Sequence, residues 1–253
     1  MRRPSLVDGA SLRPKVIQLE AAHSSLMIPA AGSVQGSGGT YFHSDFVLSN
    51  HRGTVQTIGI GWLAQGVDNS SAPLTHYTIP ANTTVFLADV VAATLGKTGL
   101  GTILVFGETP SFALDASARL LGFSRIWTNQ PNATGTVSLQ FPAVSTNDSL
   151  GSLVAFAAGL VHDSQYRTNV GIVNLDTVAH TWTIRIVGLT QGPATFTVSV
   201  PAVSMRQTSL PAGNYGDLFL QLEADGTGFW WSAYAASVDN ITGDGWVARA
   251  IQP

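Results

Sequence analysis

Four residues in the first half of the chain have the side chains of a catalytic metal site: His43, Asp45, His51 and His76. His43 and Asp45 stand two positions apart in the run YFHSDFVLSN. In a β-strand their side chains would share one face, with Cβ atoms about 6.5 to 7 Å apart. Imidazole and carboxylate are the ligands of catalytic zinc and non-haem iron. This pattern is compatible with a hydrolase that attacks an ester or phosphoester with a metal-bound water.

A second run, YRTNVGIVN, argues for a structural role instead. When the two runs are aligned, Arg167 and Asn169 occupy the positions of His43 and Asp45. An Arg and Asn pair cannot hold a metal, but it keeps the hydrogen-bonding capacity of the first pair. A polar pair that recurs by position and not by charge more often satisfies backbone groups at a turn or a seam. We therefore expect no cofactor, with a divalent metal (Zn²⁺ or Ca²⁺) as the alternative.

Two further carboxylate groups are candidates. In FALDASARL, a strand would place Asp115, Ser117 and Arg119 on one face, and Asp115 would be catalytic only if that face were buried. The loop DNITGDG, residues 239–245, clusters the oxygen ligands that calcium prefers, although Asx residues beside Gly are also usual turn chemistry. We favour the ordinary surface role for both. The sequence contains no G-x-S-x-G, H-E-x-x-H or P-loop motif, so no motif specifies a reaction.

Aromatic residues give a second functional hypothesis. The run GFWWSAY contains Trp230, Trp231 and Tyr234, and adjacent strand residues face opposite ways. One of the two Trp side chains is therefore expected to point away from its own core. An exposed Trp could stack a pyranose ring in a carbohydrate-binding module. The favoured interpretation is that this Trp seals a seam between two modules.

The sequence segments that contain these residues have the pattern of a set of strands that occurs twice. The two runs align without a gap, and their period-two alternation agrees. MIPAAG lies over VAFAAG upstream, IPANTTVFL over VPAVSMRQT downstream, and FALDASARL over WSAYAASVD further on. Asn50 and Asn174 would start equivalent turns. The sequence thus predicts an all-β protein of two homologous antiparallel β-sandwich-like modules, an internal duplication packed face to face as one pseudo-twofold body.

The expected organisation has four parts. Residues 1–25 form a lead-in with some strand character, 26–121 the first module, 122–152 a connecting segment with an edge strand, and 153–253 the second module. DVVAATLG predicts a two-turn helix with Asp89 as N-cap and Gly96 as C-cap. The Gly-rich stretch 32–42 is a rim loop, well placed to cover a pocket.

Composition excludes several classes of protein. Hydrophobic residues make up 45% of the 253, enough for a substantial core, whereas only 11% are charged. A net charge of -3 without a basic cluster disfavours nucleic acid. The absence of cysteine excludes disulfides and thiol chemistry. No apolar run approaches the ~18 residues of a membrane span.

The series IPAAG, YFHSDFVLSN, GVDNSSAP, IPANTTVFLADVVAATLGKTGLG, GLVHDSQYRTNVGIVNLD and AYAASVDNITGD resembles a family of secreted or surface-attached bacterial β-domain proteins. That resemblance implies the architecture and an extracytoplasmic setting, but no activity. We expect a non-catalytic binding or structural protein whose partner is a glycan or another surface protein. The alternatives are the hydrolase and the carbohydrate-binding module.

Overall fold

The computed structural model describes residues 24–36, 39–130, 134–145 and 150–252. The all-β prediction is confirmed, because these residues form seventeen strands and a single short helix. We call strands β1 to β9 the first sandwich and strands β10 to β17 the second sandwich. In the first they are β1 (Ser25–Gln35), β2 (Tyr41–Asn50), β3 (Gln56–Ala64), β4 (Leu74–Ile79), β5 (Thr83–Leu87), β6 (Gly99–Glu108), β7 (Leu120–Asn129), β8 (Thr136–Pro142) and β9 (Val144–Ser145). In the second they are β10 (Val154–His162), β11 (Tyr166–Asn174), β12 (His180–Gly188), β13 (Ala194–Val200), β14 (Ser204–Ser209), β15 (Gly216–Ala224), β16 (Trp231–Asp239) and β17 (Gly245–Arg249).

The first sandwich is one nine-stranded antiparallel sheet that folds over into two layers. Strands β1 and β2 pair at only two positions, Val34 with Phe42 and Gln35 with Tyr41, where one layer passes into the other. One layer has the order β4-β3-β6-β1, and in the other β5 and β7 flank β2, with β8 beyond β7. Alternating apolar residues of β3 and β2 fill the space between the layers, as the period-two pattern predicts.

The second sandwich repeats this strand order in two separate four-stranded sheets. Its layers are β10-β15-β12-β13 and β14-β11-β16-β17. Each strand of the first sandwich, β9 excepted, has a counterpart at the same place in the second, with β11 corresponding to β2 and β16 to β7. A buried cluster around Trp182, Trp231 and Leu220 forms its core.

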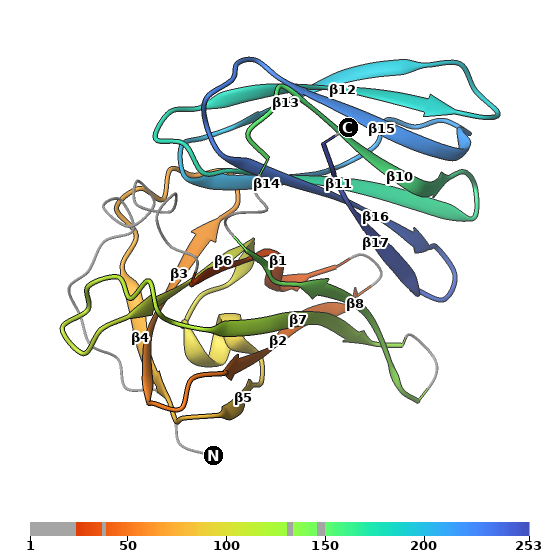
Figure 1. Ribbon diagram of the computed structural model, residues 1–253. Helices are drawn as coiled ribbons and strands as arrows, with labels where there is room; N and C mark the ends of the chain where they lie inside the picture. The colour runs from red at the N-terminus through yellow and green to blue at the C-terminus, as the bar shows by residue number, and fades with distance from the viewer. Residues whose placement is uncertain (1–23, 37–38, 131–133, 146–149, 253) are drawn as a thin grey trace.

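The two sandwiches stack through layers that are not equivalent. Layer β4-β3-β6-β1 of the first packs against layer β14-β11-β16-β17 of the second, with β14 against β3 and β6, and β11 and β16 against β1 (Figure 1). A twofold axis would bring the same layer of each sandwich into contact. The pseudo-twofold arrangement expected from the repeat is therefore wrong, and the contact is head to tail.

Hydrophobic packing and hydrogen bonds both cross the seam. Val173, Met205 and Tyr234 of the second sandwich belong to the same buried cluster as the core of the first. Asn69 donates its amide N–H to the carbonyl of Val203 at 3.0 Å. Apolar packing and hydrogen bonds therefore both hold the two sandwiches together.

Equivalent turns begin at Asn50 and Asn174, as the sequence predicts. The buried Asn50 amide donates to the carbonyls of Thr54 at 2.9 Å and Pro80 at 3.0 Å, and its Oδ1 accepts the N–H of Arg52 at 2.9 Å. The Asn50 amide makes a third donor bond, longer at 3.3 Å, to the carbonyl of Ile79. The side chain thus ties one turn to the end of another strand.

Asn174 makes the same set of bonds in the second sandwich. Its amide donates to the carbonyls of Val178 at 2.8 Å, Pro201 at 2.9 Å and Val200 at 3.4 Å, and its Oδ1 accepts the N–H of Asp176 at 3.0 Å. The shared geometry explains why both runs end in Asn.

Two segments differ from the sequence-based expectation. The run FALDASARL, residues 112–120, is expected as a strand, but its residues before Leu120 belong to a loop of turns in which Phe112 has a positive φ of 64°. Residues 122–152, expected to connect the modules, contain most of β7 and all of β8, which complete the layer around β2. Alternation in FALDASARL was misleading because the strand that pairs with β2 starts only at Leu120.

The predicted helix is present as a short π-helix, Val90–Thr94. Asp89 precedes it in a left-handed conformation and makes no side-chain cap. Its carboxylate faces His43 instead. The lead-in, residues 1–25, lies outside the described residues apart from its last two positions.

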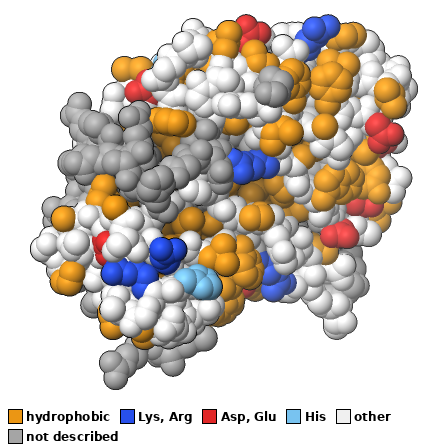
Figure 2. Space-filling model, viewed as in Figure 1, with side chains coloured by type: hydrophobic (Ala, Val, Ile, Leu, Met, Phe, Trp, Pro, Cys, Tyr) orange, Lys and Arg blue, Asp and Glu red, His pale blue; other side chains and the backbone are white. Residues whose placement is uncertain are grey.

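The surface agrees with the low charge of the sequence. On the face seen in Figure 2, charged side chains are scattered and uncharged ones dominate. No helix in the described part of the chain is long and apolar enough to cross a membrane.

Candidate functional site

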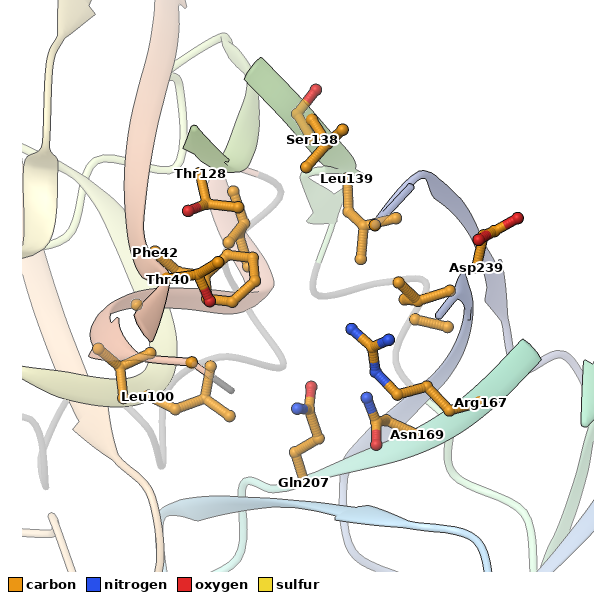
Figure 3. A pocket seen from close by; sticks show the side chains of 18 of the residues that line it. Thr40, Phe42, Leu100, Thr128, Ser138, Leu139, Arg167, Asn169, Gln207 and Asp239 are labelled. Carbon is orange, nitrogen blue, oxygen red and sulfur yellow. The ribbon is translucent and has the colours of Figure 1, made fainter. Parts of the chain in front are cut away.

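A cleft of about 780 Å³ opens at the seam between the two sandwiches (Figure 3). Strands β1, β2, β6, β7 and β8 of the first sandwich contribute to one side, and β11, β14, β16 and the turn after β16 to the other. The cleft exists because the stacked layers diverge here, where the contact between β1 and β11 gives way to the contact between β8 and β17. Its size is in the range of small-molecule sites.

The side of the cleft formed by the second sandwich is polar. Arg167 and Asn169 lie on β11, and Gln207 lies on β14. Alternate residues of a strand share a face, so β11 presents Arg167 and Asn169 together. Figure 3 shows the guanidinium of Arg167 and the amide of Gln207 pointing into the cavity. This polar wall supplies hydrogen-bonding groups at three adjacent points.

Internal hydrogen bonds fix the polar wall. The Ser209 hydroxyl donates to Asn169 Oδ1 at 2.7 Å, and the Tyr234 hydroxyl donates to Gln207 Oε1 at 2.7 Å. Gln65, from the loop after β3, accepts the backbone N–H of Gln207 on its Oε1 at 2.9 Å. Burial raises the pKa of Tyr234, so its phenol stays protonated and keeps donating.

The side formed by the first sandwich is largely apolar. Phe42, Leu100 and Leu139 line it from β2, β6 and β8. Thr40 and Gln35 lie at its edge, in the Gly-rich stretch that the sequence places over a pocket. The stretch differs from the expected rim loop, because residues 32–35 end β1 and residues 41–42 begin β2, but several of its described residues do line the cleft.

The far end of the cleft is closed by Asp239, the last residue of β16, and by Asn240 in the turn that follows. Hydrogen bonds from the Thr242 and Ile241 backbone N–H groups hold the pKa of Asp239 below its ordinary value. Figure 3 shows its carboxylate directed away from the cavity. Asn240 accepts a hydrogen bond from Arg167 Nη1 at 2.9 Å. The expected calcium loop thus has one of its carboxylates bound to its own backbone.

The described residues that line the cleft offer hydrogen-bonding groups and apolar contacts. Among them there is no His and no carboxylate besides Asp239. General acid–base work on a bound substrate needs at least one titratable group directed at it. Hydrogen-bond donors and an apolar wall, by contrast, are what orient and hold a ligand.

The predicted metal-site residues lie apart from each other. His43 and Asp45 lie on the outward face of β2, where His43 Nδ1 is 3.0 Å from Asp89 Oδ2 and Asp45 accepts the Asp89 N–H at 3.1 Å. His51 is exposed beyond the strand end. His76 is buried in the opposite layer, 2.7 Å from Glu108. Within the described residues no group of three His, Asp or Glu side chains could hold a metal ion.

Asp115 lies in the loop before β7 and forms an ion pair with Arg52 at 2.5 Å. Burial would raise the pKa of Asp115, but hydrogen bonds from the hydroxyl and N–H of Ser117, together with Arg52, outweigh burial and lower it. Asp115 is not one of the described residues that line the cleft. Its role in the structure is to tie this loop to the turn after β2.

The predicted aromatic ligand site is also placed differently. Trp231 is 1% exposed in the second core and donates its indole N–H to the carbonyl of Ser152 at 3.0 Å. Tyr234 is 1% exposed at the seam, and the partly buried Trp230 packs against the cluster that crosses it. None of these rings is free to stack a sugar, because strand alternation directs them to the two sides of a layer that is covered on both faces.

Sequence reasoning missed the residues that line the cleft. Arg167 and Asn169 were identified only as a pair unable to hold a metal, and Gln207 carried no signal. All three lie on the layer of the second sandwich that packs against the first sandwich. No local sequence pattern reveals which layer is covered in this way. A scan against models of protein families finds no match, and a search of curated proteins finds none either. The resemblance to secreted bacterial β-domain proteins therefore stays a prediction.

Proposed function

We propose that the protein is a non-catalytic, extracytoplasmic binding protein and that the cleft between its two sandwiches binds a saccharide. The observation that carries this proposal is the pairing of an amide-rich polar wall with an apolar wall across one cavity. The extracytoplasmic setting rests on the resemblance of the motif series. Binding of another surface protein, the other partner expected from the sequence, would not need an enclosed cavity.

The chemistry of the two walls matches that of a sugar ring. A pyranose has an apolar face of C–H groups and a rim of hydroxyls. Phe42 and Leu139 offer apolar surface to the first, and the amides of Asn169 and Gln207 offer hydrogen bonds to the second. The NH₂ groups of these two amides can donate to the hydroxyl oxygens, which accept hydrogen bonds.

A hydrolytic role for this cleft has less support. Glycoside hydrolysis generally uses two carboxylates on either side of the scissile bond. Asp239 is the one carboxylate among the described lining residues, and its Oδ1 accepts two backbone N–H groups of its own turn. The binding role needs no such pair.

The test is a screen of the whole chain on a glycan array, followed by isothermal titration with the saccharides that bind. Asn169→Ala removes one amide from the polar wall, and Asn214→Ala removes an exposed amide outside the cleft. We expect Asn169→Ala to weaken binding about tenfold, the value of one lost hydrogen bond of about 1.4 kcal/mol. Asn214→Ala should bind like the unmodified chain. The proposal fails if no saccharide binds, or if the two variants bind alike.

A further inference from the structure

We infer that the saccharide bound in this cleft is a sugar acid whose carboxylate is held by Arg167. This inference rests on the proposed function and names its ligand class. It derives from which hydrogen-bonding atoms of the polar wall are already in use inside the protein and which remain for a ligand.

The oxygen atoms of the wall amides are occupied. Asn169 Oδ1 accepts from Ser209, and Gln207 Oε1 accepts from Tyr234. Gln65 Oε1 accepts the backbone N–H of Gln207. An amide whose oxygen is engaged by a protein donor turns its NH₂ group to the remaining space. Each of the three amides therefore has its oxygen engaged by one donor within the protein, which leaves its NH₂ group to serve as a donor to a ligand.

Arg167 adds a cation to these donors. Its guanidinium points into the cavity, and Nη1 donates to Asn240 Oδ1 at 2.9 Å. In the described part of the chain Arg167 forms no ion pair with a carboxylate. One hydrogen bond fixes the orientation of the planar group, and the other N–H donors stay available to a ligand.

The charge balance of the cleft also favours an anion. Among the described residues of the lining, Arg167 is the one cation and Asp239 the one anion. The Asp239 carboxylate accepts backbone N–H groups of its own turn and is directed away from the cavity, so it forms no ion pair with Arg167. The charged group that points into the cavity is therefore the guanidinium of Arg167.

A carboxylate fits this wall because it has only acceptors to offer. Arg binds a carboxylate through two parallel N–H···O bonds, which are stronger than bonds between neutral groups. A neutral hydroxyl would use the same donors less well, since it carries a proton of its own. The apolar wall of Phe42 and Leu139 would hold the C–H face of the same sugar ring.

The experiment compares an oligogalacturonate with the same oligosaccharide after reduction of its carboxyl groups to alcohols. Titration uses the full chain at about 0.15 M salt. We expect the acid to bind at least about tenfold tighter, because charge-assisted bonds are about twice as strong as neutral ones. Arg167→Gln should lower the affinity for the acid to that for the reduced sugar. Arg185→Gln, an equal charge change on the exposed face of β12, should leave the preference intact.

Arg167→Lys provides a second variant that keeps the charge and removes the planar fork. It should retain only part of the preference. Equal binding of acid and reduced sugar by the unmodified chain overturns this inference and leaves the proposed function standing. Tighter binding of a sulfated sugar than of the uronate also overturns it. Binding of no saccharide defeats both proposals.

Discussion

Replacing Asn50 or Asn174 by Ala tests whether the same side-chain hydrogen bonds stabilise the equivalent turn in each sandwich. Each side chain is at most 1% exposed and makes two short donor bonds and one acceptor bond to backbone groups. Removal takes away three hydrogen bonds to part-buried backbone groups. At about 1 kcal/mol for each bond, the expected loss in the free energy of unfolding is about 3 kcal/mol. Because the geometries match, the two losses should agree within about 1 kcal/mol.

The assay is equilibrium unfolding in urea followed by tryptophan fluorescence, with the free energy taken from the midpoint and slope. Asn→Asp at either position keeps the acceptor but replaces the NH₂ donors with an oxygen that faces carbonyl oxygens. It should cost at least as much as Asn→Ala. Asn129→Ala, at an exposed position in β7, is the control and should change stability by less than about 0.5 kcal/mol. A loss below about 1 kcal/mol for Asn50→Ala, or a near-normal Asn50→Asp variant, would refute the reasoning.

Two other predictions concern the seam and the loop before β7. A Cβ at Gly171 would overlap the ring of Tyr234, so Gly171→Ala should lower the midpoint of thermal unfolding by several degrees. Gly192 has open space around it, and Gly192→Ala should leave the midpoint unchanged. Equal midpoints for the two variants in a thermal melt would contradict this packing. Because the folded pKa of Asp115 is lowered, its contribution to stability is present above the unfolded pKa of about 3.9 and lost as pH falls through the folded pKa. Asp115→Asn should therefore be less stable than the unmodified chain at pH 7 and converge with it below about pH 4; urea unfolding at both pH values measures this, and a gap that persists in acid would count against it.

The fold was predictable where the signals are local. Alternation in the runs ending at Asn50 and Asn174 identified β2 and β11, and the terminal Asn identified their turns. Local alternation failed in FALDASARL, because the loop is held by polar contacts such as Arg52 with Asp115 and not by strand pairing. Strand β8, expected as an edge strand of the connecting segment, has no sequence match in β17, yet the two strands extend equivalent layers of the two sandwiches. Whether the shared strand order reflects an internal duplication stays a prediction.

The candidate site could not be predicted from the sequence, because it depends on which layers of the two sandwiches pack against each other. In a head-to-tail stack, equivalent positions acquire different neighbours. Position 43 and its counterpart 167 occupy the same place in their layers, but the layer of His43 faces outward and the layer of Arg167 faces the first sandwich. The same holds for Phe86, which is 43% exposed, and its counterpart Gln207, which lines the cleft.

This geometry gives a physical reason for the asymmetry between the two runs. On the outward layer, the pair only has to form hydrogen bonds with neighbouring groups, and both His43 and Asp45 form them with Asp89. On the covered layer, the pair faces a cavity whose opposite wall is apolar, so its polar groups are available to whatever enters. Arg167 and Asn169 can therefore serve a ligand only because the first sandwich stands over them. A binding role would thus belong to the stacked pair and not to either sandwich alone, and it follows that the site occurs once in a chain that carries the fold twice.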